Sequence, residues 1–132
     1  MNIKDRIESI KPSQYFKSAN LHVHSDCSDG SYSFEQLVQQ AKSLGLQHLA
    51  ISDHNTVEGW KNFDYSKYDF LIPAVEFDCF YKGTLLHILG YGIDPNHPEI
   101  KKICAKTKGE TQYDIIRLFK SRHPKTAIGA IH

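Results

Sequence analysis

Hydrophobic and polar residues alternate along a short stretch near the start of the chain, between Asn20 and His24. Leu21 and Val23 are apolar and His22 and His24 are polar, which is the period-two pattern of a β-strand. Successive side chains of a strand point to opposite faces, so both imidazoles are expected on one face, roughly 7 Å apart at ~3.3 Å per residue. Two imidazoles at that spacing are able to hold one cation between them.

A helical pattern follows the loop over residues 25–31. Ser33 is expected to begin the helix, because Gln36 stands three residues later and the pair forms a capping box. Gly45 supplies the C-terminal stop. The apolar stripe expected on one face of this helix consists of Phe34, Leu37, Val38, Ala41 and Leu44.

A second strand is expected over about His48–Ser52, and it delivers Asp53 and His54 at its C-terminal end. The whole stretch is therefore predicted to be a strand–helix–strand unit. In α/β folds the functional sites lie at strand ends of this kind. The following segment, 60–68, is rich in aromatic and charged residues and is either helix or loop.

Two more strands are predicted in the middle of the chain. The run Phe70–Val75 is almost continuously apolar, as expected of a strand buried on both faces, and it ends in Glu76 and Asp78. Residues 81–84 have the composition of a turn. The chain then returns as the next strand, Leu85–Tyr91.

The N-terminal segment is predicted to form a short amphipathic helix without chemistry of its own. Ile3, Ile7 and Ile10 fall at spacings of four and three, and Pro12 is expected to end the helix.

The C-terminal segment is also predicted to be helical. Pro98 has the first position of a helix that runs to about Ser121, with an interruption near Gly109. Pro124 then opens a last helical pattern in which the chain ends. That helix has no C-terminal glycine, no basic last turn and no following strand, so we expect the chain to be part of a longer protein.

Composition narrows the classes of function. A chain of 132 residues is about one domain, and a hydrophobic fraction of 40% with a mean hydropathy of −0.45 is typical of a soluble one. A net charge of +1 predicts neither a polyanion-binding nor a membrane-binding surface. The first residues lack the apolar core of a secretory signal, and no apolar run approaches the ~20 residues of a membrane span, so we expect neither feature in these residues. The cysteines are odd in number and far apart in the sequence: Cys27, Cys79 and Cys104. This pattern argues against a disulfide framework and favours a protein of the reducing cytoplasm.

The stretch Leu21–Gly59 resembles the opening of the polymerase and histidinol phosphatase (PHP) family of metal-dependent phosphoesterases. Its first part, LHVHSDCSDG, is similar to that family's His-x-His-(Ser/Thr)…Ser-Asp-Gly motif. Its last part, ISDHNTVEG, is similar to the strand-end Asp-His-(Asn/Asp)-Thr motif. The resemblance continues through AVEFD and LLHILGYGID to about Asp94.

The resemblance implies an α/β fold for residues 1–132, namely the N-terminal portion of a distorted (β/α)7 PHP barrel with mostly parallel strands, in truncated form. In the family, later segments add a histidine from an Ala-His-Pro-like motif and an Asp-x-His pair to the metal ligands. Neither motif is present in this chain. Each metal site would therefore lack about one ligand here.

By the same resemblance, His22, His24 and Glu76 would bind a first metal ion. Glu76 would bridge to a second ion, which would also bind His87. Metal ions held ~3.5–4 Å apart clamp both the attacking and the leaving oxygen of a phosphoester. A water molecule activated by the metals would be the nucleophile, so no protein nucleophile is needed.

Asp29 and His54 would bind a third ion, whereas Asp53 is expected to fix an imidazole or the turn. Asp78 is expected to be a turn residue or to support the ligands from behind. Imidazole and carboxylate donors without thiolates suit manganese, zinc or iron better than calcium or magnesium alone. We expect two or three such ions in the complete domain.

Other interpretations exist for some of these residues. Asp29 could instead cap the Asp-Gly turn, and His87 could be a satisfied core histidine. Cys27 is expected to be a small packing residue. The residues that we expect to be surface, turn or helix-start positions, and not ligands, are His48, His97, Arg117, Arg122, His123 and His132.

The function expected from the resemblance is hydrolysis of phosphomonoesters or nucleotide phosphoesters, impaired in this short chain. The partner would be a small phosphorylated substrate, such as a nucleotide or short RNA, and neither a membrane nor duplex DNA. The alternatives are a histidinol-phosphate phosphatase or polymerase-associated nuclease, and a non-catalytic half-domain for metal binding or assembly. An unrelated amidohydrolase would also begin with His-x-His on its first strand. It would normally need a carboxylated lysine after a later strand, and no lysine of this sequence is placed at a predicted strand end.

Overall fold

The computed structural model describes residues 2–106 and 127–131 as a mixed α/β fold. The predictions for residues 107–126 and for His132, including those for Arg117, Arg122 and His123, lie outside the described residues. In chain order the elements are α1 (Ile3–Glu8), α2 (Pro12–Tyr15), β1 (Ala19–Val23), α3 (Phe34–Ser43), β2 (His48–Ile51), α4 (Glu58–Lys61), a 3-10 turn (Tyr65–Lys67), β3 (Ala74–Tyr81), β4 (Thr84–Tyr91), α5 (Pro98–Lys106) and β5 (Ala127–Ile131).

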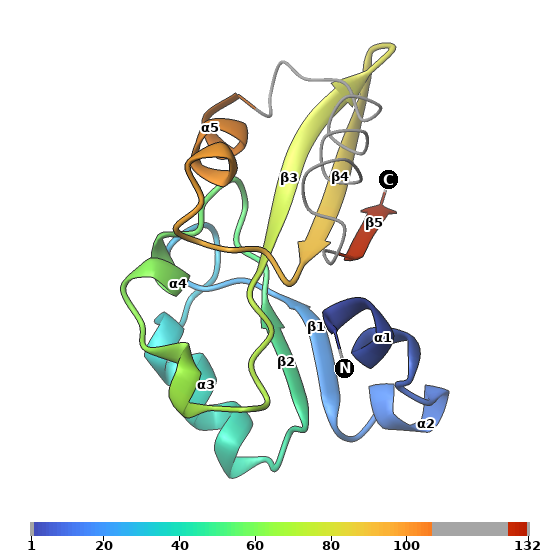
Figure 1. Cartoon of the computed structure of the whole chain (residues 1–132), viewed down its shortest axis with the longest axis vertical. Coiled ribbons are helices and arrows are strands. Elements are labelled where there is room, and N and C mark those ends of the chain that lie inside the picture. Colours follow the sequence, from blue (N-terminus) through green and yellow to red (C-terminus); the bar gives the residue numbers. More distant parts are fainter. Residues whose placement is uncertain (1, 107–126, 132) are drawn as a thin grey trace.

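The strands form two small sheets of opposite character. β1 and β2 pair in parallel, whereas β3, β4 and β5 pair antiparallel in that order. Two isolated parallel bridges, Leu49 to Leu71 and His54 to Glu76, link the sheets, and Figure 1 shows the β3–β4 hairpin extending beyond the β1–β2 pair. The prediction of mostly parallel strands is therefore wrong for the second sheet. The reason is the tight Lys82-Gly83 turn, which can join only antiparallel neighbours.

The third strand begins later than predicted. Phe70–Val75 was expected to be a strand, but pairing with β4 starts only at Ala74. Pro73 lacks a backbone N–H and cannot donate to a ladder, so the preceding segment makes a single bridge through Leu71 instead. As a consequence, Glu76 lies inside β3 and not at a strand end.

The last described element is a strand where a helix was predicted. Ala127–Ile131 pair antiparallel with β4, with Gly129 opposite Leu89. Gly129 and two β-branched isoleucines weaken the helical propensity of this segment. The unpaired edge of β4 offers a hydrogen-bonded alternative, which the local pattern does not reveal.

The long helix α3 agrees with its prediction at both ends. Ser33 and Gln36 form the capping box, with Gln36 N–H donating to Ser33 Oγ at 3.1 Å and Ser33 N–H donating to Gln36 Oε1 at 2.8 Å. Gly45 has φ +69°, and the Leu46 and Gly45 amides donate to Ala41 O and Lys42 O, which is a Schellman ending. Leu44 alone departs from the predicted apolar stripe, because its side chain is 74% exposed.

The flanking helices are close to prediction. α1 spans Ile3–Glu8, and Pro12 begins α2 as well as ending the first helical pattern. Pro98 has the first position of α5, as predicted. Within the part of the chain that the structure describes, no helix is long and apolar enough to cross a membrane.

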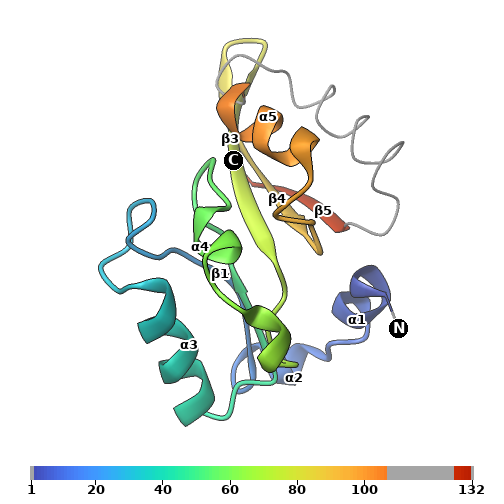
Figure 2. The ribbon, with the colours of Figure 1, turned by 60° about the vertical axis from the view of Figure 1, so that its left-hand side comes forward.

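Three apolar clusters surround the sheets. α5 lies over one face of the β3–β4 hairpin, as Figure 2 shows from the side. The residues of α3 and Trp60 pack against β2. α1 packs beside β1 and the ends of β3 and β4. The indole N–H of Trp60 donates to both Ile51 O at 2.9 Å and Ala74 O at 3.0 Å. This one side chain therefore ties β2 to β3. The sequence predicts either helix or loop for residues 60–68, and the structure has the end of α4 and a short 3-10 turn there.

Candidate metal centre

Strand alternation sends two carboxylates of β3 to one face. Val75, Phe77 and Cys79 are fully buried in the cluster under α5, so Glu76 and Asp78 must point to the opposite face. A carboxylate directed into an apolar core would carry a large desolvation cost, and the strand avoids it by this register. The Glu76 side chain is nevertheless 4% exposed, so it needs close polar partners.

The β3–β4 turn brings a histidine to the same face. Lys82 and Gly83 both have positive φ, 49° and 77°, which suits a two-residue hairpin turn. The resulting register places His87 directly opposite Asp78. His87 Nδ1 lies 2.6 Å from Asp78 Oδ1 and 3.1 Å from Glu76 Oε2.

Strand β1 contributes the His-x-His pair. The two rings point to the same side, with centroids 5.1 Å apart, as the alternation predicted. His24 Nε2 lies 3.1 Å from Glu76 Oε1, and His22 Nε2 makes a still closer contact with the same oxygen. One carboxylate oxygen therefore faces both imidazoles.

The segment after β2 places His54 between the two sheets. Its parallel bridge with Glu76 is held by Glu76 N–H donating to Asp53 O at 3.0 Å. His54 Nδ1 lies 2.9 Å from Asp78 Oδ1 and its Nε2 lies 3.3 Å from Asp29 Oδ2. His54 therefore contacts carboxylates from both halves of the site.

Asp29 lies on a loop whose conformation is fixed by a close backbone contact and by a set of hydrogen bonds. Gly30 packs on the His24 backbone so tightly that a Cβ there would lie 2.1 Å from His24 O. The buried carboxylate of Asp53 accepts hydrogen bonds from Ser25 N–H at 2.6 Å, Ser25 Oγ at 2.7 Å and Ser28 Oγ at 2.8 Å. Asp53 therefore fixes the turn, which was one of the two roles predicted for it.

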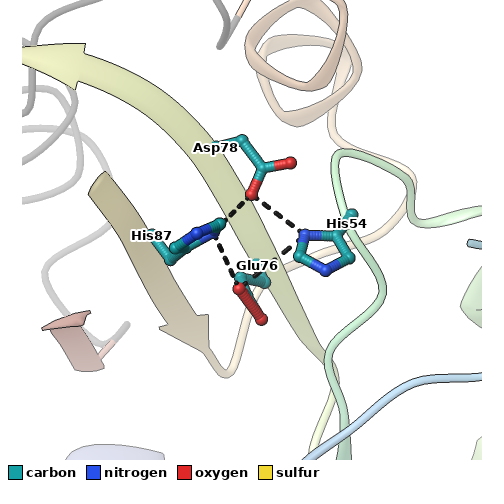
Figure 3. A group of neighbouring side chains, drawn as sticks. All are labelled: His54, Glu76, Asp78 and His87. Atoms are coloured by element: carbon teal, nitrogen blue, oxygen red, sulfur yellow. Dashed lines mark hydrogen bonds and ion pairs between the residues drawn. The ribbon is translucent and has the colours of Figure 1, made fainter. Parts of the chain in front are cut away.

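These side chains group into three overlapping sets whose donor atoms lie within 4.8 Å of one another. The first position is His22, His24 and Glu76, the second position is His54, Glu76, Asp78 and His87, and the third position is His24, Asp29 and His54. Figure 3 shows the second position, where the four side chains from β3, β4 and the segment after β2 point toward one another.

The electrostatics of the cluster favour a bound cation. Burial lowers the pKa of His54, but the carboxylates of Asp78, Glu76 and Asp29 outweigh it and raise that pKa above its ordinary value. His24 Nδ1 is buried and makes no hydrogen bond within the described residues, although Asp29 Oδ1 lies 3.1 Å away. A ring nitrogen and a carboxylate oxygen that face each other in this way are satisfied when both bind one cation. The donor set of imidazoles and carboxylates thus fits zinc, manganese or iron.

The structure brings together all six residues predicted to bind metal. Asp78 lies inside the cluster, closer to the imidazoles than the predicted turn or supporting role required. Asp29 is the most exposed member, at 66%, so the centre is open to solvent on its side.

The remaining sequence candidates have other environments. His48 Nδ1 accepts a hydrogen bond from Arg6 Nε at 3.0 Å, and His97 Nδ1 accepts from Glu99 N–H at 3.1 Å at the start of α5. Cys27 is exposed, so its predicted packing role is wrong.

One residue of the centre was missed from the sequence. Asn55 follows His54 and hydrogen-bonds to Asp78 through its side chain. The available signal was its place inside the Asp-His-Asn-Thr motif, next to a predicted ligand.

Comparison with known proteins gives consistent matches. The model of the PHP domain family matches residues 20–124. The chain is 33% identical over 93 residues to the phosphoribosyl 1,2-cyclic phosphate 1,2-diphosphodiesterase of Eggerthella lenta, an alignment that covers 67% of this chain and 36% of that protein. It is 31% identical over 120 residues to the 5'-3' exoribonuclease Rnm of Escherichia coli, covering 84% of this chain and 41% of that protein.

Two solved structures resemble the fold of this chain. A protein from Bifidobacterium adolescentis assigned as a metal-dependent phosphoesterase superposes with a TM-score of 0.60 at 30% identity, covering 69% of this chain and 33% of that chain. An amidohydrolase from Chromobacterium violaceum, solved with bound sulfate and no metal, gives a TM-score of 0.61 at 25% identity, covering 67% and 32%. The chain therefore spans between about a third and two fifths of the length of these relatives.

Proposed function

The chain belongs to the PHP domain family, and on that basis we propose that it supplies metal-binding residues of a hydrolytic phosphoesterase. One observation carries the proposal. Four imidazoles and three carboxylates, distant in sequence, converge into three overlapping sets around the buried Glu76. A convergence of this kind is costly for folding unless cations neutralise the carboxylates.

The first and second positions share Glu76, whose two oxygens face different imidazoles. Oε1 faces the β1 histidines, whereas Oε2 lies 3.1 Å from His87 Nδ1. Glu76 would therefore bridge two cations, and Asp29 with His24 and His54 would hold a third. We propose manganese, zinc or iron as the cations.

Bound divalent cations would polarise a phosphoryl oxygen and lower the pKa of a water molecule to near neutrality. The residues of this chain have the tasks of holding the donor atoms in place and of neutralising charge. Asp78 Oδ1 lies within hydrogen-bond distance of the Nδ1 atoms of His54 and His87, and this contact fixes the orientation of the two rings. The exposed side at Asp29 leaves room for a substrate to approach.

We propose a phosphodiester of a ribose-containing compound as the substrate, such as a cyclic nucleotide or a short RNA. The relative from E. lenta is named for a cyclic phosphate of phosphoribose, and the relative from E. coli is named as an exoribonuclease. Both names describe cleavage of a phosphodiester. Histidinol phosphate, a monoester, has no comparable support.

The complete relatives are longer, so we assign efficient hydrolysis to the complete protein. This chain covers 36% and 41% of the two curated relatives. The first and third positions each have three protein ligands, one fewer than a closed tetrahedral coordination sphere. The isolated chain is expected to bind metal and to hydrolyse phosphodiesters weakly.

Metal analysis of the purified chain tests this proposal. We expect at least two equivalents of manganese or zinc after equilibration and gel filtration. Glu76→Gln should bind at least about 100-fold more weakly at the first and second positions, since loss of a ligand exceeds the 10–100-fold effect of losing a supporting partner. Glu58→Gln, a change of the same kind at an exposed residue of α4, should bind normally. Equal metal content in all three proteins, or none in wild type, would contradict the metal centre.

The catalytic part is tested separately with bis(p-nitrophenyl) phosphate and a short RNA. Slow, metal-dependent turnover that Glu76→Gln abolishes is the expected result. Turnover by the isolated chain at an ordinary enzymatic rate would contradict the assignment of efficient hydrolysis to the longer protein.

A further inference from the structure

Asn55 has an unusual backbone at the edge of the proposed metal centre. It directly follows His54 and has a left-handed conformation, with φ 52°. Its N–H donates to Glu76 O at 2.9 Å, which is the last backbone bond of the parallel bridge between the β2 segment and β3. Asparagine tolerates this φ better than most residues do, because its short polar side chain can hydrogen-bond locally.

The side chain of Asn55 takes the place of its backbone in the parallel pairing with β3. In a parallel ladder the next bond would join Asp78 N–H to the backbone carbonyl of Asn55. In the structure Asp78 N–H donates instead to Asn55 Oδ1, at 3.0 Å. The amide group at the other end of the same side chain, Nδ2, donates to Asp78 Oδ2 at 3.0 Å.

These two bonds divide the Asp78 carboxylate into a held oxygen and a presented oxygen. Oδ2 is held by Asn55. Oδ1 faces His54 Nδ1 at 2.9 Å and His87 Nδ1 at 2.6 Å, the two contacts of Asp78 drawn in Figure 3. Rotation of the carboxylate would break the bond to Asn55. The presented oxygen is therefore fixed against both imidazoles.

We propose that Asn55 is the positioning residue of the second position: it orients Asp78 so that one oxygen faces a cation shared with His54, Glu76 and His87. This inference rests on the proposed metal-binding function. Asn55 itself does not contact the cation. An asparagine is required because one short side chain must both accept from a backbone N–H and donate to a carboxylate.

Two substitutions separate positioning from a merely structural role. Asn55→Asp keeps an acceptor for the Asp78 N–H but replaces the donor with a second carboxylate beside Asp78. Asn55→Gly keeps the left-handed backbone without strain and removes both side-chain bonds. Asn62→Asp is the matched control, because it makes the same chemical change at an exposed residue that ends α4.

Calorimetric titration with Zn²⁺ alone is the first measurement. Asn55→Asp should bind Zn²⁺ about 10–100-fold more weakly at one position. At zinc concentrations too low to fill that weakened position, the variant should therefore bind one equivalent fewer than wild type. Its melting temperature without metal should stay close to that of wild type. Asn62→Asp should bind as wild type does. A full complement of zinc at wild-type affinity in both Asn55 variants would overturn the inference.

Amide hydrogen exchange of the metal-free protein is the second measurement, and it does not depend on metal binding. The Asp78 amide should be protected in wild type and in Asn55→Asp, and it should lose protection in Asn55→Gly. An Asp78 amide unprotected in wild type would overturn the inference even if zinc binds. Wild type that binds no zinc but shows the expected exchange pattern would count against the proposed function, and it would support the placement of Asp78 by Asn55.

Discussion

The two halves of the centre fix their side chains by different means. In the β3–β4 hairpin, Glu76, Asp78 and His87 lie within strands, and the buried residues of the opposite face determine where they point. In the β1–β2 half, Asp29 lies on a loop whose shape depends on Gly30 and on the buried carboxylate of Asp53. Sheet register secures the first half, whereas a close backbone contact and a set of hydrogen bonds secure the second.

The difference teaches that the two halves should fail independently. Damage to the loop should remove the third position and leave the second position intact, because only the third contains Asp29. Damage to the connection between the halves should affect all three positions, since Glu76 and His54 are each shared.

Gly30→Ala should have the largest effect. The added Cβ would lie 2.1 Å from the carbonyl oxygen of His24, so the loop backbone must move. Overpacking of this kind costs ~1–3 kcal/mol, and we expect about 3 kcal/mol because the obstacle is backbone. Chemical denaturation measures the loss, and Zn²⁺ titration should show the third position empty and the second occupied.

Gly83→Ala is the control in the other half. Gly83 has φ +77° in the hairpin turn, and no atom beyond its two chain neighbours lies within 4 Å of the added Cβ. Only the left-handed conformation opposes the change, at a cost of ~1 kcal/mol. A loss as large as that of Gly30→Ala would contradict the assigned role of the loop contact.

Trp60→Phe should have the next largest effect, because it weakens the joint between the halves. The variant keeps an aromatic ring against Phe34 but removes the N–H shared by Ile51 O and Ala74 O. Loss of a buried donor costs ~1–3 kcal/mol, and we expect about 2 kcal/mol in thermal unfolding. Metal affinity should fall at every position, and a decrease confined to one position would show that the joint lies elsewhere.

Asp53→Asn should have a smaller effect that stays local to the loop. One acceptor oxygen and the negative charge are lost, while the other oxygen still accepts from Ser25 N–H and Ser28 Oγ. We expect about 1 kcal/mol of destabilisation and weaker binding at the third position. Asp64→Asn, which removes an exposed carboxylate bonded to Ser66, is the control and should change neither quantity.

His48→Asn should have the smallest effect, outside the centre, in the contact of α1 with β2. Burial and then the nearby Arg6 lower the pKa of His48 from its ordinary 6.5. The folded protein therefore binds the imidazole proton of His48 less tightly than the unfolded chain does. The contribution of His48 to the free energy of unfolding is therefore present above pH 6.5 and is lost as the pH falls below it.

The asparagine keeps an acceptor near Arg6 Nε but does not titrate. The melting temperature of the variant minus that of wild type should increase as the pH is lowered from 7.5 to 5.5. A difference that does not change with pH would show that His48 keeps its ordinary proton affinity.

Local patterns were sufficient for much of the site. The alternation around His22 and His24 and the capping box at Ser33 depend on neighbouring residues only, and both agree with the structure. Convergence of the six expected ligands was predicted from family motifs, and the structure brings these residues together.

Features that depend on partners distant in sequence were not predictable. Ala127–Ile131 form a strand because the edge of β4 is available, and Asp78 enters the cluster because the hairpin register places it opposite His87. The role of Asn55 needs both its left-handed backbone and the position of β3, and neither is visible in the pattern of residues.

The alternation within β3 has a consequence for changes in chain length. Insertion or deletion of a single residue between Glu76 and Asp78 would reverse the facing of the residues on one side of the change. One of these two carboxylates would then point into the apolar layer under α5. Related proteins can therefore be expected to vary the apolar side chains of this segment more readily than its length. Insertions in the exposed turn at Lys82-Gly83 would preserve which residues face inward only if the pairing of Asp78 with His87 were kept.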